Sequence, residues 1–302
     1  MRHCHTVFLT AYGTEVLLMR QDVSAIDAIG RTAFAVAALR AAEHRRTDRL
    51  FSDPWAEQFL RAAGEVLGPP EATEDFAALM RTQAAVRTRF FDDHLVGATE
   101  RGVRQVVLVA SGMDSRPWRL HWPEATTVFD LDQAPVLRFK DEAMEGRVAH
   151  TAATRRAVAA DLREDWASCL HAAGFRDDRP TAWLLEGILY ALNEKAAEGL
   201  LADLTRLSAP GSTLAFDHFE VGPSLRAATD RLGADLSRLW QSGPTDPAAW
   251  LSRHGWQPEV RELANVAACF GRTPHHAYDA GPGAEGHSWL AVAIRPPAPA
   301  TG

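Results

Sequence analysis

Short apolar runs alternate with helical stretches along the central part of the chain. Continuous apolar runs of this length are expected for strands of a parallel sheet that is covered on both faces. Five of them lie at 105–110, 126–131, 156–160, 181–185 and 212–216. Helical segments separate several of these runs, at 134–145, 163–173 and 193–208. Strands that alternate with helices in this way predict right-handed β-α-β units and an open, mostly parallel sheet.

The two ends of the chain carry a different pattern. Residues 31–44 have an apolar face at helical spacing, Ser52-Asp53-Pro54 is typical of a helix start, and residues 74–102 predict a long helix. Near the other end we expect two strands, at 258–263 and 288–295, preceded by an inserted helix at 225–240.

These elements predict one domain over residues 28–296. A helical cap at 28–102 would precede a core at 103–296 with a helical lid insertion near 220–245. We expect residues 1–27 to form a poorly structured extension, with Met19 as a candidate for the natural start, and 297–302 to form a disordered tail.

Composition excludes several classes of function. The formal net charge is −7 and no run of five basic residues occurs, so the chain is a poor candidate for binding nucleic acid. No apolar run approaches the roughly 20 residues of a membrane span. The three cysteines lie far apart and form no CxxC pair, which fits a reducing compartment and disfavours a zinc ribbon. We therefore expect a cytoplasmic protein with no metal, no nucleic-acid partner and no membrane partner.

Glycine and acidic residues follow the first two predicted strands, where an open α/β sheet binds its ligands. The turn at 110–115 contains the single Gly112 rather than G-x-G-x-x-G, which argues against NAD and FAD and fits S-adenosylmethionine. Asp132 follows Gly112 by 20 residues, a spacing that suits a carboxylate accepting hydrogen bonds from both ribose hydroxyls. Asp130 is the alternative for the ribose, and Asp132 would equally suit the cap of a helix that starts near Pro135.

Acidic residues also follow the third and fourth predicted strands. Asp161 can accept a hydrogen bond from an adenine amino group while Leu162 packs on the ring, although Asp161 would also suit a helix cap. Glu186 would lie near the methionine part of the donor and its positive sulfonium. Polar residues or glycine at four strand ends predict a donor site more specifically than any one of them does.

Several motifs spread over most of the chain support the same conclusion. They are Gly30-Arg31-Thr32-Ala33, Leu50-Phe51-Ser52-Asp53-Pro54-Trp55-Ala56, Arg87-Thr88-Arg89-Phe90-Phe91-Asp92-Asp93, residues 110–120, Phe129-Asp130-Leu131-Asp132-Gln133, Asp161-Leu162, Leu185-Glu186-Gly187 and Gly255-Trp256. In combination, over roughly residues 28–295, the chain resembles the leucine carboxyl methyltransferase-like family of S-adenosylmethionine-dependent methyltransferases, particularly its bacterial branch.

The resemblance implies a Rossmann-like class I methyltransferase fold: a seven-stranded, mostly parallel sheet, helices on both faces and an N-terminal helical cap. It also implies that Arg87 holds the donor carboxylate, with Arg89 as the nearest alternative, and that Gly112 lines the donor. The family often has a tyrosine five residues after the glutamate. Here the chain departs from the family, because Ala191 stands at that position and Tyr190 comes one residue earlier. Tyr190 is nevertheless named with His218 as a candidate catalytic residue.

The expected activity is methyl transfer to a carboxylate or hydroxyl of a small molecule, in bacterial secondary metabolism. A carboxylate, with a pKa of about 4, is already ionised at neutral pH and needs no general base. Catalysis would then consist of alignment and removal of water. A phenol or alcohol would need a base, for which His218 is the candidate unless it is a polar cap on the sheet edge. A non-catalytic regulatory domain that binds S-adenosylmethionine is the remaining alternative.

Overall fold

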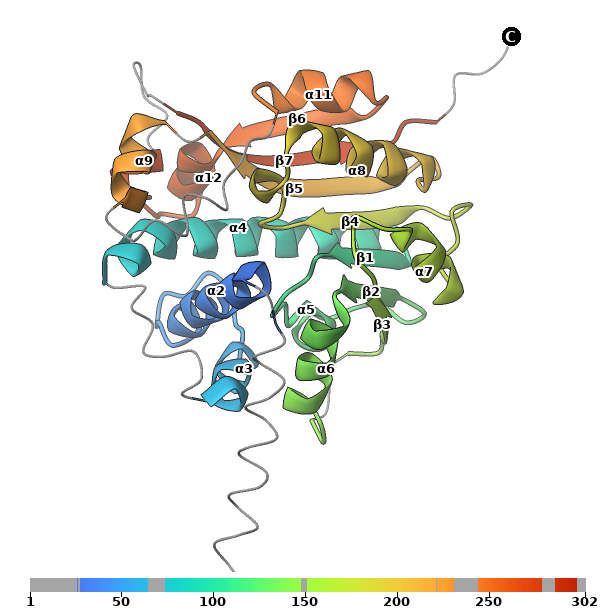
Figure 1. Ribbon diagram of the computed structural model, residues 1–302, viewed down its shortest axis with the longest axis horizontal. Helices are drawn as coiled ribbons and strands as arrows, with labels where there is room; N and C mark the ends of the chain where they lie inside the picture. The colour runs from blue at the N-terminus through green and yellow to red at the C-terminus, as the bar shows by residue number, and fades with distance from the viewer. Residues whose placement is uncertain are drawn as a thin grey trace, which may run out of the picture.

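A seven-stranded sheet runs through the centre of the molecule (Figure 1). The structure is a computed structural model that describes residues 26, 28–64, 74–147, 151–220, 222–230, 244–278 and 286–297. The strands are β1 (Gln105–Val109), β2 (Thr127–Asp132), β3 (Thr154–Ala159), β4 (Thr181–Leu185), β5 (Thr213–Phe219), β6 (Gln257–Glu262) and β7 (Ser288–Ile294). Their order is β3-β2-β1-β4-β5-β7-β6, and only the pairings of β7 with β5 and β6 are antiparallel. The predicted fold class is confirmed.

The central strands are apolar because both of their faces are covered. All five residues of β1 are buried, and so are those of β4. Side chains alternate between the faces of a strand, so Val107 and Val109 belong to one core and Val106 and Leu108 to the other. The edge strand β6 shows the contrasting pattern, in which half-buried and exposed residues alternate.

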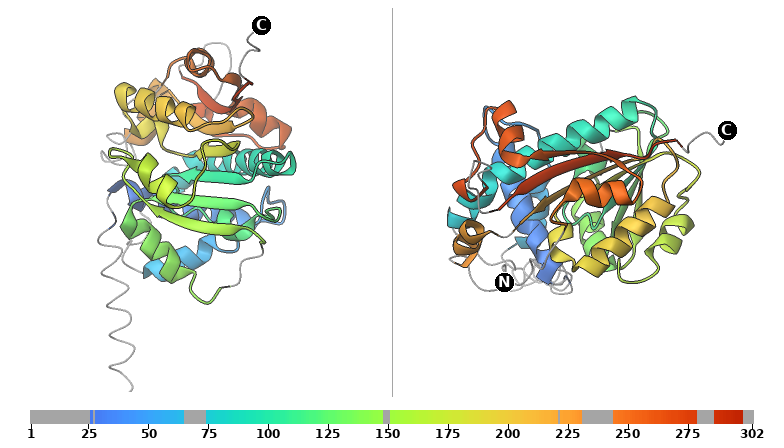
Figure 2. Two further views of the ribbon diagram at one scale, coloured as in Figure 1. Left: turned by 90° about the vertical axis from the view of Figure 1, so that its right-hand side faces the viewer. Right: turned by 90° about the horizontal axis from the view of Figure 1, so that it is seen from above.

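Helices cover both faces of the sheet (Figure 2). One face carries α7 (Trp166–Ala172), α8 (Glu194–Arg206) and α11 (Pro247–Arg253). The other face carries α4 (Glu74–Glu100) and α12 (Leu263–Cys269). Helix α6 (Ala134–Ala143) lies against β2 and β3, and α5 (Arg116–Arg119) packs beside α6. The remaining helical elements are α9 (Pro223–Asp230), η2 (Leu189–Ala191) and η3 (His276–Tyr278).

The first two described helices, α2 (Ala28–His44) and α3 (Ala56–Ala63), form a separate layer against α5 and α6. Aromatic contacts join the layers, with the rings of Phe34 and Phe139 5.1 Å apart and those of Phe59 and Trp118 6.2 Å apart. Asp53 accepts hydrogen bonds from the backbone N–H groups at the start of α3. The Asp53 side chain therefore holds the start of α3, although Trp55 occupies the N-cap position and the helix begins two residues after Pro54, which was expected in its first turn.

Caps and strand pairing explain where the observed elements differ from the predicted ones. The helix predicted from residue 163 begins at Trp166 because the Asp165 side chain accepts the Ser168 N–H. The helix predicted from 193 begins one residue later because the Asn193 side chain caps it. Strand β5 continues to Phe219 rather than ending at 216, because it pairs with β7 as far as Ser288.

The structure describes only some of the residues of the predicted extension, lid insertion and tail. Residues 1–25 and 27 of the predicted extension lie outside the described residues, whereas Ile26 is buried. Helix α9 falls in the predicted lid insertion, of which residues 231–243 lie outside the described part, as do 298–302 of the predicted tail. Among the described helices, none is both long and apolar enough to cross a membrane.

Candidate functional site

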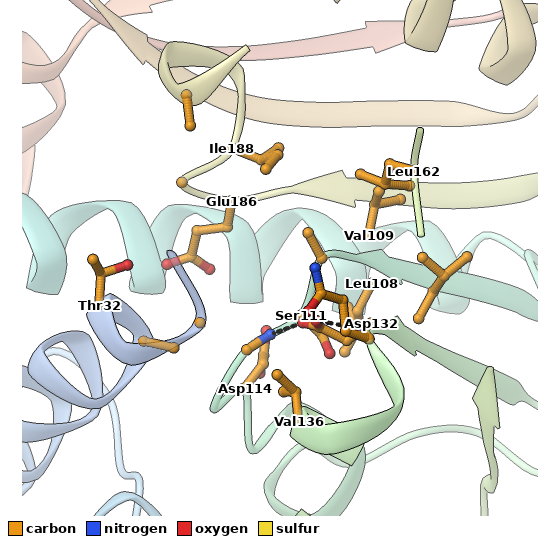
Figure 3. Close-up of a pocket in the computed structure, with 18 of the residues that line it drawn as sticks. Thr32, Leu108, Val109, Ser111, Asp114, Asp132, Val136, Leu162, Glu186 and Ile188 are labelled. Atoms are coloured by element: carbon orange, nitrogen blue, oxygen red, sulfur yellow. Dashed lines mark hydrogen bonds between the residues drawn. The ribbon is translucent and has the colours of Figure 1, made fainter. Parts of the chain in front are cut away.

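A pocket of about 440 Å³ lies where β1, β2 and β4 end (Figure 3). The turns after these strands, the segment after β3 and the inner side of α2 form its walls. All six residues predicted to bind a donor line it: Arg87, Gly112, Asp132, Asp161, Leu162 and Glu186. The pocket therefore lies at the edge of the sheet where α/β proteins of this topology bind ligands.

The turn after β1 depends on glycine at position 112. Gly112 has φ +50°, and a Cβ atom there would lie 2.7 Å from the Cβ of Ala33 in α2. Any other residue would therefore force α2 away from the turn. Ala110 also has a positive φ of 50°, which is uncommon for a residue with a side chain and concentrates at functional sites.

Asp132 holds this turn from the adjacent strand. Its Oδ2 accepts the Gly112 N–H at 2.6 Å and its Oδ1 accepts the Gln133 N–H at 2.7 Å. Burial raises the pKa of Asp132 above its ordinary value. The helix-cap alternative is not what the structure shows, since Gln133 occupies the N-cap position of α6. Asp130, the alternative for the ribose, is fully buried and does not line the pocket.

Asp161 and Leu162 lie in the segment after β3. Asp161 accepts hydrogen bonds from the Arg163 backbone N–H and its Nε, both at 2.9 Å. These bonds lower the pKa of Asp161 to about 2, so its carboxyl is ionised at neutral pH. The helix-cap alternative fails here too, because α7 begins at Trp166 with Asp165 as its cap. In Figure 3, Leu162 lies toward the opposite end of the pocket from Thr32 and Glu186.

Glu186 accepts bonds from three guanidinium groups. Its Oε1 accepts from Arg40 Nη2 at 2.8 Å and from Arg87 Nε at 2.9 Å. Its Oε2 accepts from Arg116 Nη1 at 2.6 Å. Burial alone would raise the pKa of Glu186, but the surrounding positive charges hold it well below its usual range. The carboxylate therefore ties together α2, α4 and α5 at the end of β4.

Arg87 is buried between two carboxylates, whereas Arg89 is not part of the pocket. Besides Glu186, Arg87 contacts Asp217 through Nη1 at 2.8 Å, and Asp217 also accepts the Gly187 N–H at 2.6 Å. Burial alone would lower the pKa of Arg87, but Asp217 and Glu186 raise it, so the group stays charged. Arg89 has a side chain 42% exposed and pairs with Asp93. Of the two candidates, the structure brings only Arg87 to the other predicted residues.

Tyr190 lines the pocket beside Arg87. Its hydroxyl lies 3.2 Å from where a Cβ of Gly187 would be, and its ring centre is 4.6 Å from that of Phe219. Burial raises the pKa of Tyr190 to about 12, and a hydrogen bond with Arg87 opposes that rise. Its hydroxyl is therefore protonated at neutral pH and can donate a hydrogen bond.

His218 lies on β5 and is not among the residues that line this pocket. It is 2% exposed and pairs across the sheet with Trp289, whose ring centre is 5.9 Å away. Because β5 lies between β4 and β7, His218 is not on an edge strand of the sheet. Burial lowers the pKa of His218 to about 4, and its Nδ1 has no hydrogen-bond partner among the described residues.

Three charged residues of the site were not assigned a role from the sequence. Arg116 lies within a motif quoted above, and Asp217 directly precedes His218, yet neither shows a local pattern that indicates an ion pair. Arg40 follows Gly30, Ala33 and Val36 on the pocket side of α2. That second helical stripe, next to the apolar face of the helix, is the signal that could have found Arg40.

Comparisons with known proteins identify the family. The family described as leucine carboxyl methyltransferase matches residues 33–205. A candidate S-adenosyl-L-methionine-dependent methyltransferase from Parafrankia sp. is 45% identical over 249 residues, covering 79% of this chain and 80% of the relative. Another from Streptomyces coelicolor is 42% identical over 262 residues, covering 83% and 92%.

Solved structures share the fold at low identity. A DUF574 family protein from Streptomyces avermitilis has a TM-score of 0.53 at 18% identity, covering 86% of this chain and 97% of its own. A candidate methyltransferase from Thermobifida fusca has a TM-score of 0.54 at 16% identity, covering 80% and 92%. By its family match and its close relatives, the chain belongs to the leucine carboxyl methyltransferase family of S-adenosylmethionine-dependent methyltransferases.

Proposed function

We propose that the pocket binds S-adenosylmethionine and that the protein transfers the methyl group to a carboxylate, or else a hydroxyl, of a small molecule. Family membership and the names of the relatives support the donor. The pocket supports it independently, because all six residues expected to contact the donor converge there.

The charges of the lining suggest how the donor lies. Leu162 and Asp161 would hold the adenine, Asp132 the ribose, and Arg87 the carboxylate of the methionine part. A carboxylate has about four lone-pair positions, so Asp132 can accept from ribose hydroxyls while it keeps its two backbone N–H partners. Glu186 has three of its positions occupied by guanidinium groups, which leaves one for the donor ammonium.

The observation that carries the acceptor proposal is the hydroxyl of Tyr190 at the Gly187 turn, a hydrogen-bond donor that is not assigned to the methyl donor. Tyr190 carries a protonated hydroxyl at neutral pH, its pKa being about 12. A donor of this kind can hold an oxygen that is already ionised, as a carboxylate is at neutral pH.

The chemistry then needs no proton transfer. The carboxylate oxygen forms a bond to the methyl carbon while the carbon–sulfur bond breaks, and its electron pair remains on sulfur as S-adenosylhomocysteine. The protein contributes alignment of the two reactants and exclusion of water from the nucleophile. A hydroxyl acceptor would require a base, and His218, the candidate for that role, lies on β5 outside the described lining. This favours the carboxylate.

The test is methyl transfer from a methyl-labelled donor to a panel of small carboxylic acids and phenols. We expect products that release methanol in mild alkali, as methyl esters do, and a kcat/KM that is nearly flat from about pH 6 to 8 because the nucleophile is ionised throughout. An alkali-stable product whose rate rises with pH would indicate a hydroxyl acceptor. Donor binding without any product would favour the regulatory alternative.

Replacement of Asp132 by alanine is expected to weaken donor binding. Hydrogen bonds to a charged group contribute about 1.5–3 kcal/mol, which corresponds to an increase in Kd of roughly ten- to a hundredfold. Calorimetric titration with S-adenosylhomocysteine measures it. Asp178→Ala, at a carboxyl 59% exposed, is the control. An unchanged Kd in a folded Asp132→Ala protein would rule out a ribose role.

A further inference from the structure

A fully buried lysine lies beneath the turn that follows β1. Lys140, on α6, donates from Nζ to Asp130 Oδ1 at 2.7 Å and to Ser111 Oγ at 3.1 Å. Both Lys140 and Asp130 have no measurable exposure. Lysine is almost never fully buried unless its charge is paired. Lys140 does not line the pocket, whereas Ser111 does.

The ammonium group is part of a connected set of polar contacts around Asp130. The Oδ2 of Asp130 accepts from Arg155 Nε at 2.7 Å, and its carboxyl also has a hydrogen bond with Ser111. Lys140, Ser111 and Asp130 thus contact one another pairwise. Because α6 positions the ammonium, Ser111, the second residue of the turn at 110–115, is fixed relative to both β2 and α6.

This set acts on Asp132 by geometry and by charge. Ser111 N–H donates to Leu131 O at 3.1 Å, and the next residue, Gly112, donates to Asp132 at 2.6 Å. Burial raises the pKa of Asp132, the charge of Lys140 lowers it and the charge of Asp130 raises it. Neutralising Lys140 would therefore loosen the turn and also leave Asp132 next to a less compensated carboxylate.

We infer that Lys140 is a positioning residue for the donor: it fixes Ser111 and the Gly112 turn so that Asp132 meets the ribose, without touching the donor itself. This inference rests on the proposed function, since it takes the donor to occupy the pocket.

The test replaces Lys140 by methionine, which retains much of its length, and uses Arg138→Met as the matched control. Arg138 is exposed on the same helix, so its replacement removes the same charge without disturbing the turn. Arg155 also pairs with Asp130, so we expect this carboxylate to keep one cationic partner in Lys140→Met. Ser111→Ala removes only the contacts of the hydroxyl with Lys140 and Asp130, and it serves as a second variant if Lys140→Met folds poorly.

Two measurements apply to each variant. We expect Lys140→Met to raise the Kd for S-adenosylhomocysteine by about tenfold or more, and to move the acid side of the binding profile to higher pH. We also expect faster amide hydrogen exchange confined to residues 110–115 in the protein without ligand. Ser111→Ala should show the same changes at smaller size, and Arg138→Met should show neither.

The outcomes separate this inference from the proposed function. If the wild-type protein binds the donor and Lys140→Met binds it equally well with the same pH profile, Lys140 has no positioning role. If exchange rises throughout the domain and the pH profile keeps its shape, Lys140 stabilises the fold only, and the inference is also overturned. If the wild-type protein does not bind the donor at all, the proposed function fails instead.

Discussion

Replacement of Arg87 by lysine is expected to weaken S-adenosylmethionine binding by about 1.5–3 kcal/mol, or roughly ten- to a hundredfold in Kd. Arg87 uses Nε for Glu186 and Nη1 for Asp217, at 2.9 and 2.8 Å. A planar guanidinium can hold two carboxylates and still face a third, whereas an ammonium is a point charge without that fork. Lysine would keep the charge but lose the geometry, so calorimetry of a folded variant measures the geometric contribution.

Removal of the Arg87 charge should also destabilise the folded protein. Arg87→Ala would leave Glu186 and Asp217 buried with less compensation, and breaking a buried ion pair in this way typically destabilises a protein by about 3–5 kcal/mol. We therefore expect Arg87→Ala to lower the free energy of unfolding clearly, as measured in urea, whereas Arg87→Lys lowers it less.

Arg89→Lys provides the matched control on the same helix. Arg89 makes an exposed pair with Asp93 at i,i+4, and such pairs contribute only about 0.3–0.5 kcal/mol. Its donor affinity should therefore equal that of the wild type. Loss of donor binding in Arg89→Lys together with normal binding in Arg87→Lys would contradict the assignment of the donor carboxylate.

The sheet was predictable because its central strands are buried on both faces. In the runs 105–110 and 181–185 every residue after the first is apolar for that reason, and the lengths of the runs exclude long helices. Boundaries were less predictable where side chains decide them. The Asp165 side chain caps α7, so the helix begins at Trp166 and not earlier. Pairing with β7 extends β5 beyond its apolar run.

Some pocket residues could be predicted from the sequence and others could not. Gly112 and Asp132 could be found from their place after strands, since strand ends meet at one edge of the sheet. Arg87 could not, because several arginines share its helix and only the resemblance to a family singled it out. Its partner Asp217 comes from a distant part of the chain, and so does Arg40, which donates to the same oxygen of Glu186 as Arg87 does. Ion pairs that depend on three-dimensional proximity leave no spacing signal in a single sequence.

Acidification from pH 7.5 to 5 is expected to destabilise the folded protein by about 4 kcal/mol, because the buried His218 and the half-buried His94 must stay neutral. Burial lowers the pKa of His218 to about 4. Burial, with a smaller contribution from Arg101, lowers the pKa of His94 to about 4 as well. In the unfolded chain each imidazole would titrate near 6.5. Between these values the unfolded state binds more protons, so stability is fully present above pH 6.5 and is lost as the pH falls toward 4.

Each histidine should contribute about 2 kcal/mol of this loss by pH 5, at 1.36 kcal/mol for each unit between 6.5 and 5. The buried carboxylates whose pKa values are lowered, including Glu186, Asp92 and Asp130, act below their ordinary values of 4.5 and 3.8. They therefore add little in this window. Urea unfolding at several pH values measures how steeply the free energy of unfolding falls with decreasing pH. This slope should be about half as large in His218→Leu.

His121→Gln is the control for this slope, because His121 is exposed and its replacement should leave the pH dependence of unfolding as it is in the wild type. His94 also reports on β5, since its Nε2 lies 3.1 Å from Thr213 Oγ1 at the start of that strand. Its replacement should therefore also reduce the pH dependence of the free energy of unfolding. A free energy of unfolding that stays constant from pH 7.5 to 5 would mean that His218 and His94 take up protons in the folded state as readily as in the unfolded one. His218 would then have to be reached by solvent, and its candidacy as the base for a hydroxyl acceptor would become stronger.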